Sequence, residues 1–462
     1  MAPPPAKGAT LVETIVSQIR EEIFSGARPA ASRLLSIRKA SEHYGVSKNT
    51  VVEAYDRLVA AGLIAARKGS GFVVAQAVDA DGAGRPRHVA EAIDIASLLG
   101  AQLEQSFAIR VGDGRPPPSW TEQSEIRRHL GAYGRPASIE TDGYGAASGF
   151  RPLRQQIARR LADRQIEAGE DNVLMTFGAN HALDLIIRSM LRAGDTVLVD
   201  EPGYYPLFAK LALAQVRVVG VRRNPDGPDI ADLNAKLARE RPKLFFTQSL
   251  GHNPTGGSIS LSVAHAVLTA AAQHNLTVIE DDPFADLPAS SSHRLATLDQ
   301  LRTVISVGTF AKTLSASLRS GFILARRDRI QALAELKMLT TVNSSGHVEM
   351  LLHRLLADGH YDRHLRRLWQ RISNASETVQ EKLRQAGWQT YADMIGGYYQ
   401  YLLLPEGVSD IELARKGARE SIFIAPGSVF CVDKHSPLAR GIRINISRAD
   451  DQRFYDFLLR SL

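Results

Sequence analysis

The sequence predicts two folded parts: a small N-terminal part of helices with a two-stranded hairpin, and a large α/β body with a mostly parallel sheet. Residues 11–74 show short amphipathic helices separated by tight turns. Beyond residue 108, continuously apolar β-like runs alternate with helical segments. A length of 462 residues also suits two or three domains better than one.

Composition is that of an ordinary globular chain, with 44% hydrophobic and 23% charged residues. The single cysteine, Cys431, excludes an intrachain disulfide and a cysteine zinc site. No apolar run is long enough to span a bilayer, and the N-terminus lacks the apolar centre of a signal peptide. We therefore expect a soluble, cytoplasmic protein without a membrane partner.

The formal charge of +7 is concentrated at the N-terminal end. Residues 1–76 contain ten Lys and Arg against six Asp and Glu, whereas the rest of the chain contains 46 against 43. A basic part joined to a near-neutral body is typical of proteins that bind nucleic acid.

Three helices are expected in the N-terminal part, at residues 11–24, 36–44 and 48–60. Ser36 and Ser47 are suited to cap the second and third helices, and Gly45 supplies the tight turn between them. The apolar stripe of the first helix is Leu11, Val12, Ile15, Val16, Ile19 and Ile23. The inward face of the third should be Val51, Val52, Tyr55, Leu58 and Val59.

Residues 62–74 predict two short strands with a basic, Gly-rich tip, which together form a wing. A helix, a short turn, a second helix and a wing make up a DNA-reading unit. The side chains suited to contact phosphates or base edges are Arg38, Lys48, Asn49, Thr50, Arg67 and Lys68. The alternative is a small helical domain with a solvated basic face.

Residues 10–74 resemble a GntR-type winged helix-turn-helix. The matching segments are Leu35-Ser36-Ile37-Arg38, Tyr44-Gly45-Val46-Ser47, Thr50 through Leu58, and Gly69-Ser70-Gly71-Phe72-Val73. Leu35 departs from the family, which commonly has Pro there. The resemblance implies that residues 1–76 bind double-stranded operator DNA. Residues 77–107 are small, charged and turn-rich, and we expect a flexible linker.

Seven apolar runs predict the sheet of the body, placed at residues 108–462. Because most are continuously apolar, the strands should be covered on both faces by the intervening helices. Ligands on such sheets bind beyond the carboxyl ends of the strands. The runs are 172–177, 196–199, 216–221, 243–248, 276–280, 303–307 and 321–325.

Polar motifs follow several of these runs. Gly178, Ala179 and Asn180 form a Gly turn at a helix start, where backbone N–H groups attract phosphate, or else an ordinary βα turn. Tyr204 could stack on a flat ring or be a core tyrosine. Asn253 lies in a rigid Asn-Pro turn, where its amide could hydrogen-bond a phenolate oxygen.

Asp281 ends a very apolar strand as part of Glu280-Asp281-Asp282. A buried carboxylate there could pair with a protonated pyridine nitrogen, or serve as a salt bridge or cap. Arg443 lies in an apolar strand, where burial is costly unless the guanidinium faces an anion such as an effector carboxylate, or a structural ion-pair partner.

Lys312 follows another strand, with Thr309 three residues before it and Arg319 seven after it. A lysine beside a hydroxyl and a guanidinium suits a Schiff base to pyridoxal 5'-phosphate (PLP), although most lysines are solvated surface. His360 and His364 lie one helical turn apart, but no third ligand is evident and no metal site is predicted.

Residues 108–462 resemble the fold-type I, aspartate aminotransferase-like family of PLP proteins. The resemblance implies a smaller C-terminal α+β subdomain, a Schiff base at Lys312, and a tyrosine, Tyr144, that reaches the partner subunit's phosphate. Phe284 stands where many members have a tyrosine that donates to the cofactor's phenolate oxygen, which puts transaminase turnover in doubt. The matching motifs are Tyr144-Gly145, Gly178-Ala179, Tyr204, Asn253-Pro254-Thr255-Gly256, Asp281, Thr309 through Lys312, Arg319 and Arg443.

Both halves together resemble the MocR/GabR subfamily of transcription regulators. The resemblance implies a head-to-tail, domain-swapped homodimer that senses an amino compound through external aldimine formation at Lys312 and so repositions its heads on DNA. The alternatives are a working aminotransferase with an accessory DNA-binding domain, and a structural DNA-binding protein that has lost the cofactor.

Overall fold

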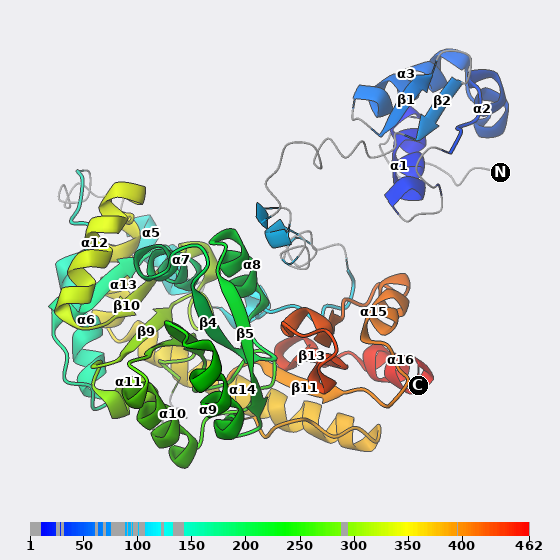
Figure 1. Cartoon of the computed structure of the whole chain (residues 1–462). Helices are drawn as coiled ribbons and strands as arrows, with labels where there is room; N and C mark the ends of the chain where they lie inside the picture. The colour runs from blue at the N-terminus through cyan, green and yellow to red at the C-terminus, as the bar shows by residue number, and fades with distance from the viewer. Residues whose placement is uncertain are drawn as a thin grey trace. The chain divides into compact units, whose positions relative to one another are not determined.

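The computed structural model of the chain consists of two compact units, Met1–Arg87 and His88–Leu462 (Figure 1). The division falls within the predicted linker, most of which lies outside the residues that the structure describes. The described residues are 11–24, 28, 32–60, 63–67, 71–74, 88–89, 91–93, 95, 100, 107–121, 124–132, 143–287, 294–394 and 396–461.

The N-terminal unit has the predicted order of three helices and a hairpin. The helices are α1 (Leu11–Phe24), α2 (Ile37–Tyr44) and α3 (Lys48–Ala60). Strand β1 (Ile64–Arg67) pairs antiparallel with β2 (Gly71–Val74). The small hydrophobic core of this unit forms where the apolar stripe of α1 packs against α3 and the hairpin.

The predicted turn between α2 and α3 is present with both of its serine caps. Ser36 Oγ accepts from the Lys39 N–H at 3.4 Å, and Ser47 Oγ accepts from the Thr50 N–H at 3.1 Å. Gly45 adopts a left-handed φ of 66°, which costs glycine nothing and allows the chain to reverse sharply.

The predicted inward face of α3 was partly wrong. Val51, Tyr55 and Leu58 are buried as expected, but Val52 and Val59 are exposed and Ala54 is buried instead. Residues 51, 54, 55 and 58 follow the helical period more closely, so the narrow stripe that faces α1 leaves no room for the two flanking valines.

The larger unit is built on an eight-stranded sheet in the order β3-β10-β9-β8-β7-β4-β5-β6. All seven predicted strands are present; β6 is a two-residue addition that forms a hairpin with β5 at the sheet edge. Strand β10 runs antiparallel to β3 and β9, and β4, β5, β7, β8 and β9 are parallel. The bounds are β3 Val173–Thr176, β4 Thr196–Glu201, β5 Arg217–Asn224, β6 Gly227–Pro228, β7 Leu244–Thr247, β8 Thr277–Asp282, β9 Val304–Thr309 and β10 Gly321–Leu324.

Helices cover both faces of this sheet. Consecutive strand residues belong to different hydrophobic clusters: Val278 of β8 packs into one and Ile279 into the other. This alternation explains why the strands are continuously apolar. The helices are α5 (Ser124–Ala132), α6 (Arg151–Ala162), α7 (Ala179–Met190), α8 (Tyr205–Leu213), α9 (Ile230–Glu240), α10 (Leu261–Gln273), α11 (Leu295–Asp299), α12 (Arg327–Thr341), α13 (Gly346–Ala357) and α14 (His360–Gln385).

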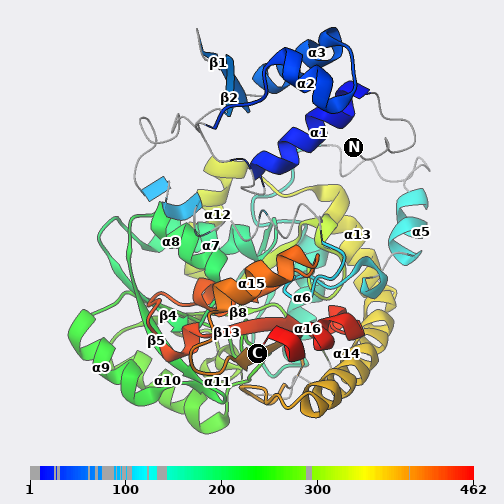
Figure 2. The same cartoon turned by 90° about the vertical axis from the view of Figure 1, so that its right-hand side faces the viewer.

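A smaller C-terminal subdomain contains a three-stranded antiparallel sheet in the order β11-β13-β12. It faces the viewer in Figure 2, where α15 and α16 are labelled beside β13. Among the residues that the structure describes, no helix is both long and apolar enough to cross a membrane. The bounds are β11 Tyr399–Leu403, β12 Ala425–Pro426, β13 Gly441–Asn445, α15 Asp410–Arg419 and α16 Gln452–Ser461.

An extended segment, residues 107–116, joins this subdomain at the start of the body. The Ile109 N–H donates to the Ser421 carbonyl at 3.1 Å, and the Asn445 N–H donates to the Val111 carbonyl at 2.7 Å. The Gly112 N–H donates to the Phe423 carbonyl at 2.8 Å. The entry segment is therefore held by main-chain hydrogen bonds to residues more than 300 positions away.

Candidate functional site

The predicted site residues gather beyond the carboxyl ends of the central strands. Gly178 follows β3, Tyr204 follows β4, Asn253 follows β7, and Lys312 follows β9, while Asp281 is the penultimate residue of β8. Parallel strands bring these ends to one edge of the sheet, which is where open α/β sheets bind ligands.

Gly178 and the first turn of α7 form a cradle for an anion. Gly178 has a φ of 85° and provides no side-chain cap. The N–H groups of Ala179 and Asn180 donate to no residue that the structure describes. A Cβ on Gly178 would lie 3.5 Å from Arg319 Nη2 and 3.9 Å from Thr309 Oγ1. Free amides at a helix N-terminus, a guanidinium and a hydroxyl therefore converge, as a phosphate requires.

The three consecutive acids at the end of β8 have different environments. Glu280 accepts from the N–H groups of Leu295 and Ala296 at 2.8 and 2.9 Å, so it caps α11. Asp282 pairs with Arg294 at 2.5 Å. Asp281 forms no ion pair with the described residues, and this distinguishes it as the acid available to a ligand.

Asp281 has one oxygen in use and one without a partner. Its Oδ2 accepts from Gln248 Nε2 at 3.3 Å, whereas Oδ1 is buried and accepts no hydrogen bond from the described residues. Burial, helped by the neighbouring Asp282 and opposed by Lys312, raises the pKa of Asp281 to about 7. A cation or N–H donor placed at Oδ1 would lower this pKa again.

Tyr204 and Asp281 line one small cavity, together with Gln248 and His252. The Tyr204 hydroxyl contacts Asn180 Oδ1 at 3.4 Å, which connects the predicted ring-stacking residue to the anion cradle. Burial lowers the pKa of His252 to about 4, so this histidine is neutral and holds the turn through Thr255 Oγ1 at 2.8 Å.

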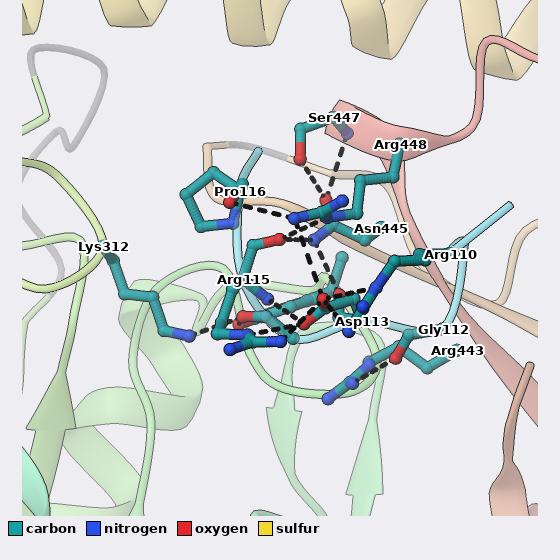
Figure 3. A network of polar contacts seen from close by, with 12 residues as sticks. Arg110, Gly112, Asp113, Arg115, Pro116, Lys312, Arg443, Asn445, Ser447 and Arg448 are labelled. Carbon is teal, nitrogen blue, oxygen red and sulfur yellow. Dashed lines mark hydrogen bonds and ion pairs between the residues drawn. The ribbon is translucent and has the colours of Figure 1, made fainter. Parts of the chain in front are cut away.

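Arg443 and Asn253 face one another across the site. Arg443 is 1% exposed; its Nη1 donates to Asn253 Oδ1 at 2.9 Å and its Nη2 to the Gly112 carbonyl at 2.7 Å (Figure 3). No carboxylate among the described residues pairs with it, and its Nε is buried without a partner. Because the Asn253 amide oxygen accepts from Arg443, the amide NH₂ remains a donor.

Lys312 is directed at the entry segment. Its Nζ donates to the Gly114 carbonyl at 2.5 Å (Figure 3). The Tyr399 hydroxyl donates to the same carbonyl at 2.9 Å, and the Tyr398 hydroxyl donates to the Lys312 carbonyl at 2.7 Å. The backbone of residues 112–114 therefore supplies acceptors to both Lys312 and Arg443.

Phe284 is buried and packs its ring against Tyr398 and Tyr399, with ring centroids 5.4 and 6.1 Å apart. It has no hydrogen-bonding group, as the sequence predicts. The Tyr399 hydroxyl and Lys312 Nζ instead donate to one oxygen, the Gly114 carbonyl. Sequence reasoning did not identify Tyr399.

The entry segment was also missed. Gly112, Gly114 and Arg115 contribute acceptors or cavity walls beside Lys312, and Asn445 Nδ2 donates to the carbonyls of Asp113 and Arg115 at 2.7 and 3.0 Å. The available signal was the Gly-Asp-Gly turn, followed after Arg115 by three prolines, which predicts a bend but not its partners.

Tyr144 is the one predicted cofactor residue that lies apart from this cluster. Its side chain is 91% exposed. In a single chain it makes no contact with the cradle residues, and its predicted role concerns the partner subunit's phosphate.

The predicted DNA-contacting residues lie on the exposed side of the N-terminal unit. Arg38, Lys48 and Asn49 are exposed and Thr50 is half-buried. Arg67 is the last residue of β1, and Lys68 lies outside the described residues. Lys48 and Asn49 begin α3, the helix that follows the turn.

His360 and His364, which lie one turn apart on α14, have separate environments. His364 is buried and its Nε2 contacts the Thr313 carbonyl at 2.7 Å. His360 lies near His129 and Asp358, with ligand atoms within 4.8 Å of one another. Arg363 contacts His360 Nδ1 at 2.5 Å, and its positive charge would oppose a cation.

The residues fit PLP. The buried Asp281 Oδ1 is suited to a pyridine N–H, the Gly178 cradle to a phosphate, and Lys312 to an aldehyde. Asn253 keeps its amide NH₂ as a donor, and Tyr204 lines a small cavity together with Asp281.

Comparisons with known proteins agree with both units. The model for aminotransferase class I and II matches residues 108–458, and that for bacterial regulatory proteins of the gntR family matches residues 11–74. The uncharacterized HTH-type transcriptional regulator YdcR of Escherichia coli is 27% identical over 90% of this chain and 91% of its own. The probable rhizopine catabolism regulatory protein MocR of Rhizobium meliloti is 28% identical over 94% of this chain and 90% of its own.

A solved structure extends the comparison to the fold of the body. LysN, an α-aminoadipate aminotransferase from Thermus thermophilus complexed with N-(5'-phosphopyridoxyl)-L-leucine, is 25% identical, with a TM-score of 0.71 over 81% of this chain and 94% of that one. The chain therefore belongs to the aminotransferase class I and II family. With its gntR-family N-terminal domain, it has the combination of domains found in the MocR-type helix-turn-helix transcription regulators.

Proposed function

We propose that this regulator senses an amino compound through PLP held at Lys312, and that the compound alters DNA binding by the N-terminal unit. The observation that carries the proposal is Arg443, whose guanidinium is fully buried and has no carboxylate partner among the described residues. The segment that accepts from Arg443 also accepts from Lys312, at the sheet edge where PLP would bind. A buried cation without its own anion favours an anionic ligand.

PLP supplies an aldehyde carbon that can exchange its bond to a lysine amine for a bond to an incoming amine. Lys312 provides the first of these amines. The Ala179 and Asn180 amides, Arg319 and Thr309 would hold the phosphate, and Asp281 would keep the pyridine nitrogen protonated. Asn253 would donate to the phenolate oxygen, and Tyr204 would stack on the ring.

Arg443 would bind the carboxylate of the incoming compound. To do so it would exchange the Gly112 carbonyl, a neutral acceptor, for a charged one, and charge-assisted hydrogen bonds are roughly twice as strong as neutral ones. Binding would therefore disturb the entry segment, which continues into the linker and the N-terminal unit. This continuity offers a route from ligand to DNA binding.

A homodimer accounts for the exposed groups near Tyr144. Leu339 is 82% exposed, and Met338 and Val342 are also exposed at the end of α12. The Lys337 ammonium donates to the Ala147 carbonyl at 2.7 Å, which joins α12 to the Tyr144 segment. A second subunit would cover these apolar side chains and could receive Tyr144 at its phosphate cradle.

In the N-terminal unit, the start of α3 would enter the major groove of operator DNA. Lys48 and Asn49 are exposed on its first turn, where recognition helices contact phosphates and base edges. Arg38 on α2 is suited to a phosphate contact, and the same role is proposed for Arg67, the last residue of β1, and for Lys68, which lies outside the described residues.

The test combines absorbance with DNA binding. Purified protein should show the visible absorbance of lysine-bound PLP, and Lys312→Ala should abolish it. DNA from upstream of its own operon should be bound in a gel shift, and a suitable amino compound should change that affinity in wild type but not in Lys312→Ala. Specific DNA binding that no amino compound alters, despite PLP loading, would refute the sensing proposal.

A second candidate is a working aminotransferase with an accessory DNA-binding domain. It is favoured by the cofactor-type residues that gather around Lys312 and by the likeness to an α-aminoadipate aminotransferase. Phe284, which cannot donate a hydrogen bond, opposes it. Steady multiple turnovers with an amino acid and 2-oxoglutarate would establish this activity, whereas at most one turnover per site would support the sensor.

A further inference from the structure

We infer that Tyr361, near the start of α14, is a positioning residue that holds Lys312 in place for PLP. The inference rests on the proposed function and adds a residue to its site. Lys312 and Thr313 lie in a turn between β9 and the 3-10 helix Ala316–Leu318. Neither a helix nor a strand fixes the main chain of this turn, so its position depends on side chains from other elements.

Three hydrogen bonds from such side chains hold the turn. The Tyr398 hydroxyl donates to the Lys312 carbonyl at 2.7 Å. His364 Nε2 donates to the Thr313 carbonyl at 2.7 Å, because a carbonyl oxygen can only accept. The Thr313 hydroxyl lies 2.7 Å from the Tyr361 hydroxyl. Since the Lys312 Cα and carbonyl share one planar peptide group with the Thr313 nitrogen, these contacts fix the point from which the lysine side chain projects.

Tyr361 contacts the turn at two points. Its hydroxyl contacts Thr313, and its ring packs edge-on against the ring of Phe310, with centroids 5.7 Å apart. Tyr361 is 0% exposed and Thr313 is 1% exposed, so water does not compete for the contact between their hydroxyls. The turn that carries Lys312 is therefore both packed against and hydrogen-bonded to this one side chain of α14.

Asp286 sets the direction of the contact between Tyr361 and Thr313. The Tyr361 hydroxyl also lies 2.8 Å from Asp286 Oδ2. Burial raises the pKa of Asp286, but the charges of Arg164 and Arg160, together with hydrogen bonds, outweigh burial and hold this pKa below its usual value. The carboxylate is therefore ionised and only accepts. Tyr361 thus donates its single proton to Asp286, and the Thr313 hydroxyl donates to Tyr361.

Asp286 is in turn fixed by two arginines. Arg164 Nη2 and Arg160 Nε pair with its Oδ1. The Arg160 guanidinium also lies over the Tyr361 ring, 5.1 Å from its centroid. A continuous set of contacts therefore runs from α6 through Asp286 and Tyr361 to the residue after Lys312. Buried hydrogen-bond networks whose members are satisfied favour a single arrangement, and a lysine held in one arrangement loses less entropy when PLP binds.

Removal of single hydroxyls tests the inference on the full-length protein. Tyr361→Phe and Thr313→Val should each raise the PLP dissociation constant about 10-fold, the effect of one buried hydrogen bond. The constant is measured from the visible absorbance of lysine-bound PLP. Thr313→Ser, which keeps the hydroxyl, should bind PLP like wild type. Because the two hydroxyls form one contact, the double variant should lose little more affinity than either single variant.

Tyr455→Phe is the matched control. Tyr455 is also buried in the larger unit, and its hydroxyl donates to the Ala449 carbonyl at 2.6 Å. It lies on α16, apart from the contacts that hold Lys312. Tyr361→Phe and Tyr455→Phe should both lower the melting temperature of PLP-free protein, because each removes a buried hydrogen bond. Only Tyr361→Phe should weaken PLP binding.

The outcomes separate this inference from the proposed function. If Tyr361→Phe and Thr313→Val lower the melting temperature but bind PLP as tightly as wild type, the contacts are structural and the inference is overturned. It is also overturned if Tyr455→Phe weakens PLP binding as much as Tyr361→Phe, because PLP affinity would then only follow stability. If wild type shows no visible absorbance of lysine-bound PLP, the proposed function fails and this inference fails with it.

Discussion

Arg223 on β5 and Arg443 on β13 are both buried in strands, yet their surroundings differ. Arg223 is 0% exposed and pairs with Asp200 at 2.9 Å, with Thr247 Oγ1 at 3.2 Å as a further acceptor. Arg443 has only neutral acceptors, the Asn253 amide and the Gly112 carbonyl. Arg223 therefore has a carboxylate partner, although its Nε and Nη2 are buried without a hydrogen bond. Arg443 has no carboxylate partner among the described residues and lies over the rings of Tyr399 and Phe430.

The same contrast separates Asp282 from Asp281. Asp282 has its own arginine, Arg294, and Asp281 has only the Gln248 amide. A missing counter-charge therefore occurs twice at one edge of the sheet, once for a cation and once for an anion. Buried charges are normally paired, and under the proposed function the cofactor would supply the partner of Asp281 and the effector the partner of Arg443.

The largest expected effect on stability comes from breaking the ion pair between Arg223 and Asp200. Arg223→Met leaves Asp200 buried next to a neutral His252 and should lower the free energy of unfolding by roughly 3–5 kcal/mol. Chemical denaturation measures it. The double variant Arg223→Met/Asp200→Asn should recover much of the loss, because no buried charge is left unpaired. If the single variant were as stable as wild type, the pair would not be the structural contact described above.

Arg443→Met should have a small effect on stability and a large effect on effector binding. We expect a change in unfolding free energy within about 1 kcal/mol, because no carboxylate is left behind, and a loss of effector affinity of about 2–3 kcal/mol, or roughly 30-fold or more. Absorbance titration of PLP-loaded protein gives the affinity. Unchanged PLP loading is the control, and an unaltered effector response would make Arg443 structural.

Asp281 extends the comparison to pH. Its pKa of about 7 lies above the ordinary value of 3.8 because burial disfavours the charged form. PLP-free protein should therefore lose stability as pH rises from about 4 through 7, by up to a few kcal/mol. Asp281→Asn cannot ionise and should lose this dependence, which denaturation at pH 5 and pH 8 would reveal. A variant with the wild-type pH profile would assign the titration to another group.

The smallest effect concerns DNA binding by the N-terminal unit, where two basic residues, one with an ion pair and one without, can be compared. Arg38 Nε lies 3.4 Å from Glu42, whereas Lys48 has no ion pair with the described residues. Lys48→Ala should weaken DNA binding by about 1 kcal/mol and reduce the salt slope by about one, and Arg38→Ala should do less. Fluorescence anisotropy at several salt concentrations measures both. PLP absorbance should not change, and a parallel loss of absorbance would contradict the division of roles.

The strands, the N-terminal helices and the polar residues at strand ends could be predicted because they depend on local patterns. Continuous apolar runs indicate buried strands, and a residue directly after such a run lies at the sheet edge wherever the strand pairs. The period of two also places Glu280 and Asp282 on one side of β8 and Asp281 on the other. Which of the three acids lacks a partner depended on Arg294 and α11, and only the structure supplied it.

The entry segment and Tyr399 could not be predicted from local patterns. Gly112 contacts an arginine 331 positions away, and Gly114 contacts a lysine 198 positions away. Such pairings follow from how the C-terminal subdomain packs on the body. On α3, the exact inward face was missed for a related reason, since the period permits several neighbouring stripes and the contact with α1 selects one.

Under the proposed function, the carbonyls of Gly112 and Gly114 would compete with the ligand for Arg443 and Lys312. A ligand would have to replace these backbone contacts, so the more stable the contacts are, the lower the apparent affinity of the ligand would be. In such a sensor, the concentration at which the protein responds would depend partly on residues that do not contact the ligand, such as Asn445, which holds the entry segment through two carbonyls. Sensitivity could change during evolution by altering this hold while the ligand contacts stayed the same.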